Sequence, residues 1–341
     1  MSWLSDLTVV SGGFLTGLAL VVGLLWWRVI RRPRKVIGVA LAAVASLVLA
    51  ADLVNAYYSF LPNVSDVADA ATMAAPGHLP PVSVQQRLKV GRGGRTYRLA
   101  IPDRGSGFGR TDAWLWLPPE YFSDPNLRLP VVYLFHGSPG RPKDWFHGGR
   151  AGRIAARLPM PVIVVAPQLS KSWTDDPECV DGVHEKVETH LIRDVIPTVD
   201  AQLRTRPDRA DRIFAGMSAG GFCALNLGLR HRNLTGTILD LSGETRPTHS
   251  GGMRHLFGGD VRSAWANSPD RYATGLPPGP PMRVWLDCGA DDHGVLGQLR
   301  RIAPVLRADG MTVQLHVRPG GHSYSVWRPA LRDGLRWALP N

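Results

Sequence analysis

Residues 213–221 of this chain are Ile-Phe-Ala-Gly-Met-Ser-Ala-Gly-Gly, an apolar run that leads into a Gly-x-Ser-x-Gly motif around Ser218. The small and apolar residues at 222–229 have the pattern of a helix. A strand, a sharp turn at a serine and then a helix are the context in which a serine is exposed as a nucleophile. Such a turn leaves little room around the serine, so the two flanking glycines meet a steric need. The alternative interpretation is an ordinary turn between a strand and a helix.

Short apolar runs alternate with helical patterns from about residue 82 onward. The runs at 130–135 and 161–166 are continuously apolar, which is typical of strands buried on both faces of a sheet. Further strands are expected at 95–101, 113–117, 237–241, 282–288 and 312–317, and helices at 148–158, 184–203 (interrupted near Pro197), 295–308 and 325–339. This alternation predicts an α/β fold with a mostly parallel sheet and helices on both faces.

Two later loops carry side chains that could complete a catalytic triad with Ser218. The strand at 282–288 is followed by Gly-Ala-Asp291-Asp292, and the strand at 312–317 by a glycine-rich loop that contains His322. In an α/β-hydrolase the acid and the histidine follow the serine in this order. We therefore predict an α/β-hydrolase fold in which Ser218, one aspartate and His322 form the triad. The alternatives are a helix cap for the aspartate pair, with one capping and the other free, and a surface loop histidine.

A serine nucleophile also needs two backbone N–H groups that point at the developing alkoxide. One is expected from Ala219, which follows the nucleophile, and the other from the loop 136–140, where we favour the amide of Ser138. A simple turn at the end of the strand is the alternative for this loop. His184 and His190 are six residues apart, which does not place them on one helix face. We expect neither a metal nor a cofactor.

Two long, nearly uncharged stretches precede this domain, at residues 7–30 and 36–53. Each reaches the roughly 18–25 residues that cross a bilayer core. We predict a membrane anchor at residues 1–60 with two transmembrane helices (about 7–30 and 36–58), a linker at 61–81 and a catalytic domain at 82–341. A cleaved signal peptide is the alternative, but its positive charge would precede the apolar run, whereas here the charge follows it.

The charges around these stretches predict the orientation in the membrane. The segment between them is strongly basic, and its charged residues are Arg28, Arg31, Arg32, Arg34 and Lys35. The positive-inside rule places this connector in the cytoplasm and the catalytic domain outside. The formal net charge is +11, but beyond the anchor it is spread over isolated arginines without a basic helix or zinc spacing. We therefore expect no nucleic-acid partner.

Three cysteines are too few for a disulfide framework, although one pair could form outside the cytoplasm. Cys288, at the end of a buried strand, is expected to be free, and Cys179 is the candidate partner of Cys223. The sequence leaves the oligomeric state open.

Several segments together resemble an esterase family that includes S-formylglutathione hydrolase, feruloyl esterases and the antigen 85 mycolyltransferases. They are PVVYLFHGSPGRPKDW (130–145), AGMSAGGFCALNLGLRH (215–231), WANSPD around Ser268, LDCGADD and GGHSYSVW, and the resemblance covers about residues 95–340. In such esterases the acid ends a Gly-x-x-Asp, which implies Asp292 rather than Asp291, and the loop histidine corresponds to His322. The loop WTDDPECVDG looks like that of actinobacterial membrane-anchored members.

The resemblance implies a serine esterase that works through an acyl-enzyme. Because a secreted enzyme would reach a soluble ester equally well, the anchor leads us to expect a lipid-linked or cell-envelope ester as substrate. Retention of the enzyme at the cell is the alternative role of the anchor. Two other functions stay open: an envelope acyltransferase, similar to the mycolyltransferases, that passes the acyl group to a sugar or lipid alcohol, and a non-catalytic anchored binding module.

Overall fold

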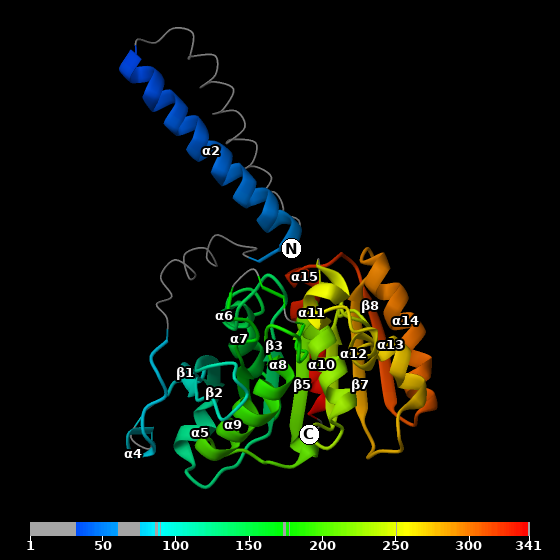
Figure 1. Cartoon of the computed structure of the whole chain (residues 1–341). Coiled ribbons are helices and arrows are strands. Elements are labelled where there is room, and N and C mark those ends of the chain that lie inside the picture. The colour runs from blue at the N-terminus through cyan, green and yellow to red at the C-terminus, as the bar shows by residue number, and fades with distance from the viewer. Residues whose placement is uncertain are drawn as a thin grey trace. The chain divides into compact units, whose positions relative to one another are not determined.

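The computed structural model of the chain describes residues 32–60, 76–85, 88, 90–172, 175–176, 178–249 and 251–339. The chain divides into two compact units. The first contains the N-terminal helix α2 (Arg32–Tyr58), and the second begins at Ala74 and contains the sheet (Figure 1). Each unit is described by itself.

The second unit is built on one eight-stranded sheet. Its strands are β1 (Arg95–Ile101), β2 (Thr111–Leu117), β3 (Val131–Phe135), β4 (Ile163–Ala166), β5 (Arg212–Met217), β6 (Thr237–Leu241), β7 (Arg283–Gly289) and β8 (Thr312–Arg318). Their order across the sheet is β1-β2-β4-β3-β5-β6-β7-β8. Strand β2 runs antiparallel to both β1 and β4, and all other neighbours are parallel. The predicted fold class, a mostly parallel α/β sheet of the hydrolase type, is confirmed.

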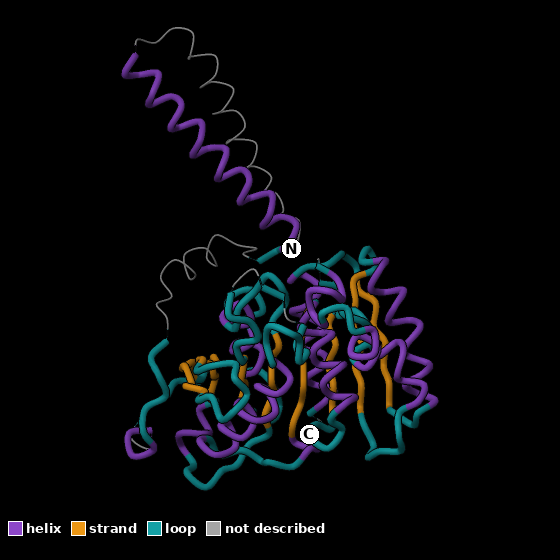
Figure 2. The backbone as a smooth tube through the Cα atoms, in the orientation of Figure 1, coloured by secondary structure: helices purple, strands orange, loops and turns teal. Residues whose placement is uncertain are grey.

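Helices cover both faces of this sheet, as Figure 2 shows by the purple segments on either side of the orange strands. In chain order they are α4 (Val82–Gln85), α5 (Pro119–Ser123), α6 (Lys143–Phe146), α7 (Ala151–Ala155), α8 (Val187–His190), α9 (Ile196–Gln202), α10 (Ala219–Arg230), α11 (Gly252–Phe257), α12 (Val261–Ala266), α13 (Pro269–Tyr272), α14 (His293–Ala308) and α15 (Tyr324–Ala338). Short 3-10 turns occupy Arg209–Asp211 and Ala273–Gly275.

The alternation of side chains along the strands separates the two layers of the core. Ile238 and Val284 belong to one buried cluster with apolar residues of α10 and α14. Leu239 and Trp285, the next residue of each strand, point the other way, because successive side chains of a strand alternate between faces. A Cβ on Gly334 of α15 would lie 3.3 Å from both of these side chains, so α15 covers the second face.

The long helix expected at residues 184–203 is shorter and is interrupted, as predicted, near Pro197. Helices α8 and α9 are joined by a π-helical turn at Leu191–Val195. Proline has no N–H, and its ring crowds the carbonyl four residues earlier in a regular helix. The wider turn lies directly before Ile196, the residue that precedes this proline. The three short helices α11 to α13, of four to six residues each, were not predicted.

The first unit contributes one helix that is long and apolar enough to cross a membrane. The candidate span is Ile37–Asn55, with a mean hydropathy of 2.4, and it is the single such helix among the described residues. The predicted span at 7–30 lies outside the described residues, as does most of the predicted linker at 61–81. The end of that linker belongs to the second unit, because Gly77 accepts from the N–H of Arg98 and Leu79 donates to its carbonyl.

A disulfide joins Cys179 to Cys223 of α10, and Cys288 is buried and free. The expected pairing of the three cysteines is confirmed. The bridge links a segment that follows β4 to the helix that begins next to Ser218.

We expect reduction of this disulfide to lower the free energy of unfolding. With a sequence separation of 44 between the cysteines, the chain-entropy model gives a loss of about 4 kcal/mol. Thermal unfolding with and without reductant measures the effect, and the Cys288→Ser variant, which keeps the disulfide, should respond to reductant in the same way. Alkylation in denaturant should modify one thiol before reduction and three after it. Three modified thiols before reduction would exclude the pair.

Candidate active site

Ser218 lies at the sharp turn between β5 and α10, with φ 56° and ψ −128°. A positive φ is strained for a residue other than glycine. The neighbouring glycines make the turn possible: a Cβ on Gly216 would lie 1.8 Å from the carbonyl oxygen of Gly220. A Cβ on Gly220 would lie 2.0 Å from the carbonyl oxygen of Phe135. The motif is thus the tight strand–turn–helix that its sequence predicts, and the serine lies partly exposed at the end of its strand.

His322 connects Ser218 to Asp292 by two hydrogen bonds. Its Nε2 lies 2.8 Å from the serine Oγ, and its Nδ1 lies 2.6 Å from Oδ2 of the aspartate. When Nδ1–H donates to the carboxylate, Nε2 is left as an acceptor for the hydroxyl proton. The three residues follow β5, β7 and β8, whose carboxyl ends lie at one edge of the parallel sheet. The structure therefore brings the three predicted side chains together.

The two neighbouring aspartates have different positions. Asp292 occupies the N-cap position of α14, but its side chain makes no capping hydrogen bond. Its carboxylate is hydrogen-bonded to His322 instead. Asp291 donates its backbone N–H to the carbonyl of Gly320, which ties the aspartate loop to the histidine loop. The helix cap expected from this pair is not formed, and it is Asp292 that reaches the histidine.

The two candidate oxyanion donors, Ser138 and Ala219, line one small cavity. The loop that carries Ser138 passes directly against Ser218. A Cβ on Gly137 would lie 3.3 Å from the Cβ of Ser218 and 3.4 Å from the carbonyl oxygen of Met217. A glycine at this position lets the backbone approach Ser218 closely.

The buried side chain of His136 links the loop 136–140 to the segment at Leu169. The sequence did not indicate this contact. The His136 ring places Nδ1 2.9 Å from the carbonyl oxygen of Gly137, and its Nε2 lies 3.3 Å from the backbone nitrogen of Leu169. Burial lowers the pKa of the His136 imidazole to about 4. The ring is therefore neutral at pH 7, donates through Nδ1 and accepts through Nε2.

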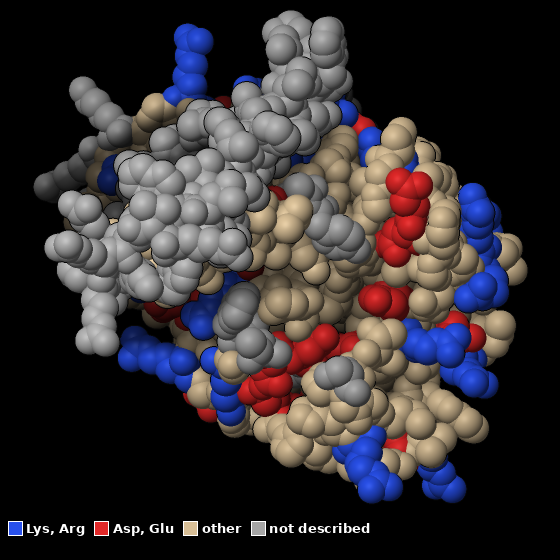
Figure 3. Space-filling model, turned by 90° about the horizontal axis from the view of Figure 1, so that it is seen from above, with Lys and Arg blue, Asp and Glu red and all other residues tan. Residues whose placement is uncertain are grey.

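Acidic side chains gather beside the same cavity. Asp175, Asp176 and Glu178 line it, and Figure 3, the view from above, shows acidic side chains near the middle of the face. Burial, with the nearby charge of Glu244, raises the pKa of Asp176 to about 6, and burial raises the pKa of Glu178 well above its usual value. We call Asp175, Asp176, Glu178 and Glu244 the acidic wall. The sequence WTDDPEC carries three of these residues, but only their place in the fold brings them to the cavity.

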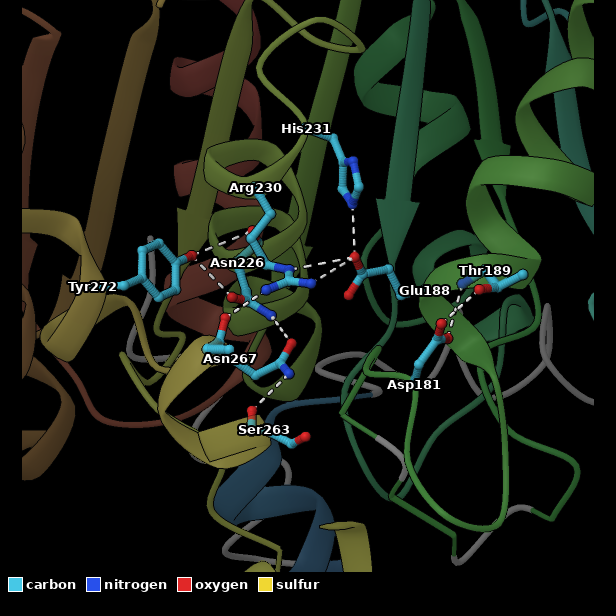
Figure 4. A network of polar contacts seen from close by, with 10 residues as sticks. Asp181, Glu188, Thr189, Asn226, Arg230, His231, Ser263, Asn267 and Tyr272 are labelled. Carbon is cyan, nitrogen blue, oxygen red and sulfur yellow. Dashed lines mark hydrogen bonds and ion pairs between the residues drawn. The ribbon is translucent and has the colours of Figure 1, made fainter. Parts of the chain in front are cut away.

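The far end of α10 is held by a polar network (Figure 4). Glu188 of α8 accepts a hydrogen bond from Nη2 of Arg230 at 3.1 Å, and Nε2 of His231 lies 2.6 Å from the same carboxylate oxygen. Asn226 donates to the side-chain oxygen of Asn267 at 3.1 Å. These contacts fix α10, the helix that begins after Ser218, to α8 and to the segment after α12.

One group of side chains among the described residues brings possible metal ligands together. Ligand atoms of Asp175, His249 and His255 lie within 4.8 Å of one another. However, Nδ1 of His249 accepts a hydrogen bond from the N–H of Gly251 at 2.8 Å. The neutral ring then carries its proton on Nε2 and has no free lone pair for a metal. We assign no metal to this group.

The chain is similar to known esterases in sequence. The family model described as "Putative esterase" matches residues 109–338. An uncharacterized protein of Corynebacterium glutamicum is 31% identical over 248 residues, which is 69% of this chain and 58% of that protein. An acetyl esterase of Caldicellulosiruptor saccharolyticus is 26% identical over 61% of this chain and 83% of its own length. For an esterase of Mycobacterium tuberculosis the identity is 26%, over 64% of this chain and 55% of that protein. The chain thus spans little more than half of two of these relatives.

Solved structures share the fold at lower sequence identity. A ferulic acid esterase superposes with a TM-score of 0.61 at 22% identity, over 72% of this chain and 97% of that one. An S-formylglutathione hydrolase from Agrobacterium tumefaciens gives 0.59 at 16% identity, over 73% and 96%. The region that the family model matches includes Ser218, Asp292 and His322, and it extends from β2 to α15. By this match the chain belongs to the esterase family.

Proposed function

We propose that the protein is a serine hydrolase that cleaves carboxylic esters through an acyl-enzyme, with Ser218 as nucleophile, His322 as general base and acid, and Asp292 as the orienting acid. The observation that carries the proposal is the continuous chain of hydrogen bonds from the Asp292 carboxylate through His322 to the Ser218 hydroxyl. A scaffold has no physical need for a serine at a strained turn that is joined by hydrogen bonds to a histidine and an aspartate.

In this mechanism Nε2 of His322 takes the hydroxyl proton while the Oγ of Ser218 attacks the ester carbonyl. Asp292 stabilises the imidazolium that forms. The amides of Ala219 and Ser138 donate to the oxygen that becomes negative. Collapse of the intermediate expels the alcohol, which takes its proton from the histidine. Water then repeats the sequence on the acyl-serine and releases the acid.

The proposal includes a tether to a membrane. Its support is the apolar helix Ile37–Asn55 and the basic residues that precede it in the sequence. About 16 residues separate Phe60 from Gly77. Even a fully flexible chain of that length reaches only roughly 22 Å, so a tether of this length keeps the site near the bilayer and raises the effective concentration of lipid-linked esters there. We therefore propose an extracytoplasmic domain that acts on esters in or near the bilayer.

A shortened protein that begins at Ala74, the first residue of the second unit, tests the tether. It and the full chain in vesicles should hydrolyse a short chromogenic ester at similar rates, because both keep the triad. The full chain should hydrolyse a lipid ester in the same vesicles at least about tenfold faster, as the raised effective concentration implies. Full-length Ser218→Ala gives the background rate.

If the full chain and the shortened protein hydrolyse the lipid ester in vesicles at equal rates, the anchor serves only to retain the enzyme at the cell. Mass analysis of the products with and without an added sugar alcohol separates hydrolysis from acyl transfer, since only a transferase forms a new ester.

A further inference from the structure

A groove lies beside the active site, toward the β1 edge of the sheet. Its volume is about 550 Å³, which lies within the range of small-molecule sites. Its walls come from the β1–β2 hairpin, from the residues that follow the loop 136–140, and from the segment that follows β4.

The groove is strongly basic. The cations that line it are Arg98, Arg110, Arg141, Lys143 and Lys171, and the single acid among its lining residues is Asp112. That acid is already paired: Nη1 of Arg98 lies 3.4 Å from its carboxylate, and Nε2 of His78 lies 3.2 Å from it. No carboxylate of the described part of the chain lies at ion-pair distance from the other four cations. These four cations therefore make no ion pair with a described carboxylate, although Asp144 lies near Arg141 and Lys143, and Glu185 lies near Lys171.

The groove also has an aromatic side chain in its lining. Trp114 of β2 lines the groove and is partly exposed. The rings of Phe146 and His147 lie 5.5 and 5.6 Å from its ring and hold it in place. A rigid, partly exposed indole can pack against the apolar part of a ligand while the cations bind its charged part.

The groove continues the site around Ser218. Ser170 lines both the groove and the small cavity that Ser138 and Ala219 border. Arg141 directly follows the loop that carries Ser138. Three residues of the acidic wall, Asp175, Asp176 and Glu178, line the cavity, so a negative group is repelled there and attracted in the groove. The charge distribution therefore favours a substrate whose negative group lies in the groove while its ester lies at Ser218.

We propose that the groove binds a phosphate group carried by the ester substrate, while the ester lies at Ser218. A phosphate matches four unpaired cations better than a single carboxylate, because it carries more negative charge and accepts bidentate bonds from arginine. The phosphate can belong to a lipid headgroup or to a soluble phosphate ester, and both present the same chemistry. This inference rests on the proposed esterase function and names its substrate class.

The test compares two esters that differ only in the phosphate, 1-decanoylglycerol and 1-decanoylglycerol 3-phosphate. The quantity measured is the ratio of kcat/KM for the phosphate ester to that for the neutral ester. Arg110→Gln with Lys171→Gln removes two groove charges. Arg300→Gln with Arg301→Gln removes two charges from exposed positions of α14, at the opposite end of the sheet, and is the matched control.

We expect a ratio of about ten or more for the unaltered protein and for the control, and a ratio near one for the groove variant, with a preference that weakens as salt is added. A ratio near one in the unaltered protein, or a high ratio that survives in the groove variant, overturns the inference. Presenting the esters as dispersed monomers and in phosphatidylcholine vesicles separates the two sources, since a preference confined to vesicles identifies a lipid headgroup.

Failure of the esterase proposal gives a different result. If Ser218→Ala hydrolyses the neutral ester as fast as the unaltered protein, the proposed function itself is wrong, and the inference is wrong with it. If hydrolysis of the neutral ester depends on Ser218 but the ratio is near one, only the phosphate inference fails.

Discussion

Ser218→Ala is expected to lower kcat for a short chromogenic ester by roughly 10⁴- to 10⁶-fold, since removal of a triad nucleophile costs on this order. The substitution removes the one oxygen that His322 contacts at 2.8 Å and leaves the backbone donors in place. Because alanine also has a Cβ, it keeps the steric demands of the turn, and the fold should persist. A fluorophosphonate probe should label the unaltered protein and not the variant.

The matched control is Ser123→Ala, which changes an exposed serine at the end of α5. It should retain both labelling and turnover. Equal labelling of Ser218→Ala and of the unaltered protein would show that another group is the nucleophile. Thermal unfolding of both variants checks that a loss of activity is not a loss of the fold.

Asp292→Asn is expected to lower kcat by about 10³- to 10⁴-fold, whereas Asp291→Asn should change it by no more than a few-fold. The carboxylate of Asp292 accepts a hydrogen bond from Nδ1 of His322 at 2.6 Å, and this bond keeps Nε2 free to take the serine proton. An asparagine amide can donate to Nδ1 instead. The ring then carries its proton on Nε2 and can no longer act as a base toward Ser218.

Asp291→Asn is the internal control, because it is the same chemical change one residue away on the same loop. Measurement of kcat and KM separately distinguishes a lost base from weakened binding, since the former lowers kcat alone. His322→Ala should reproduce the loss seen for Asp292→Asn. A larger effect at Asp291 than at Asp292 would contradict the assignment of the acid.

The sequence predicted those parts of the fold and site that local pattern determines. The continuously apolar strands are identified by composition, and the turn at Ser218 by two glycines that sterics require. The order of serine, aspartate and histidine along the chain predicted which residues meet, because parallel strands carry their carboxyl ends to one edge. The choice between Asp291 and Asp292 came from the family resemblance alone.

Other features depend on neighbours that are remote in the sequence, and the pattern could not reveal them. His136 was placed in the loop expected to supply an oxyanion donor, yet its own role depends on the amide of Leu169, 33 residues away. Glu244 follows β6 and adds to the acidic wall only because β6 lies next to β5. The short helices α11 to α13 are too brief to show a periodic pattern. The basic groove likewise combines three separate segments.

The disulfide between Cys179 and Cys223 has a consequence for how the protein is prepared. Cys223 lies in the first turns of the helix that begins after the nucleophile, and Cys179 directly follows Glu178 of the acidic wall. In a host cytosol that keeps thiols reduced, this bond does not persist. Protein produced there lacks the covalent link between the acidic wall and α10. Its substrate preference can then differ from that of protein folded in an oxidising compartment, even though the serine, histidine and aspartate are the same.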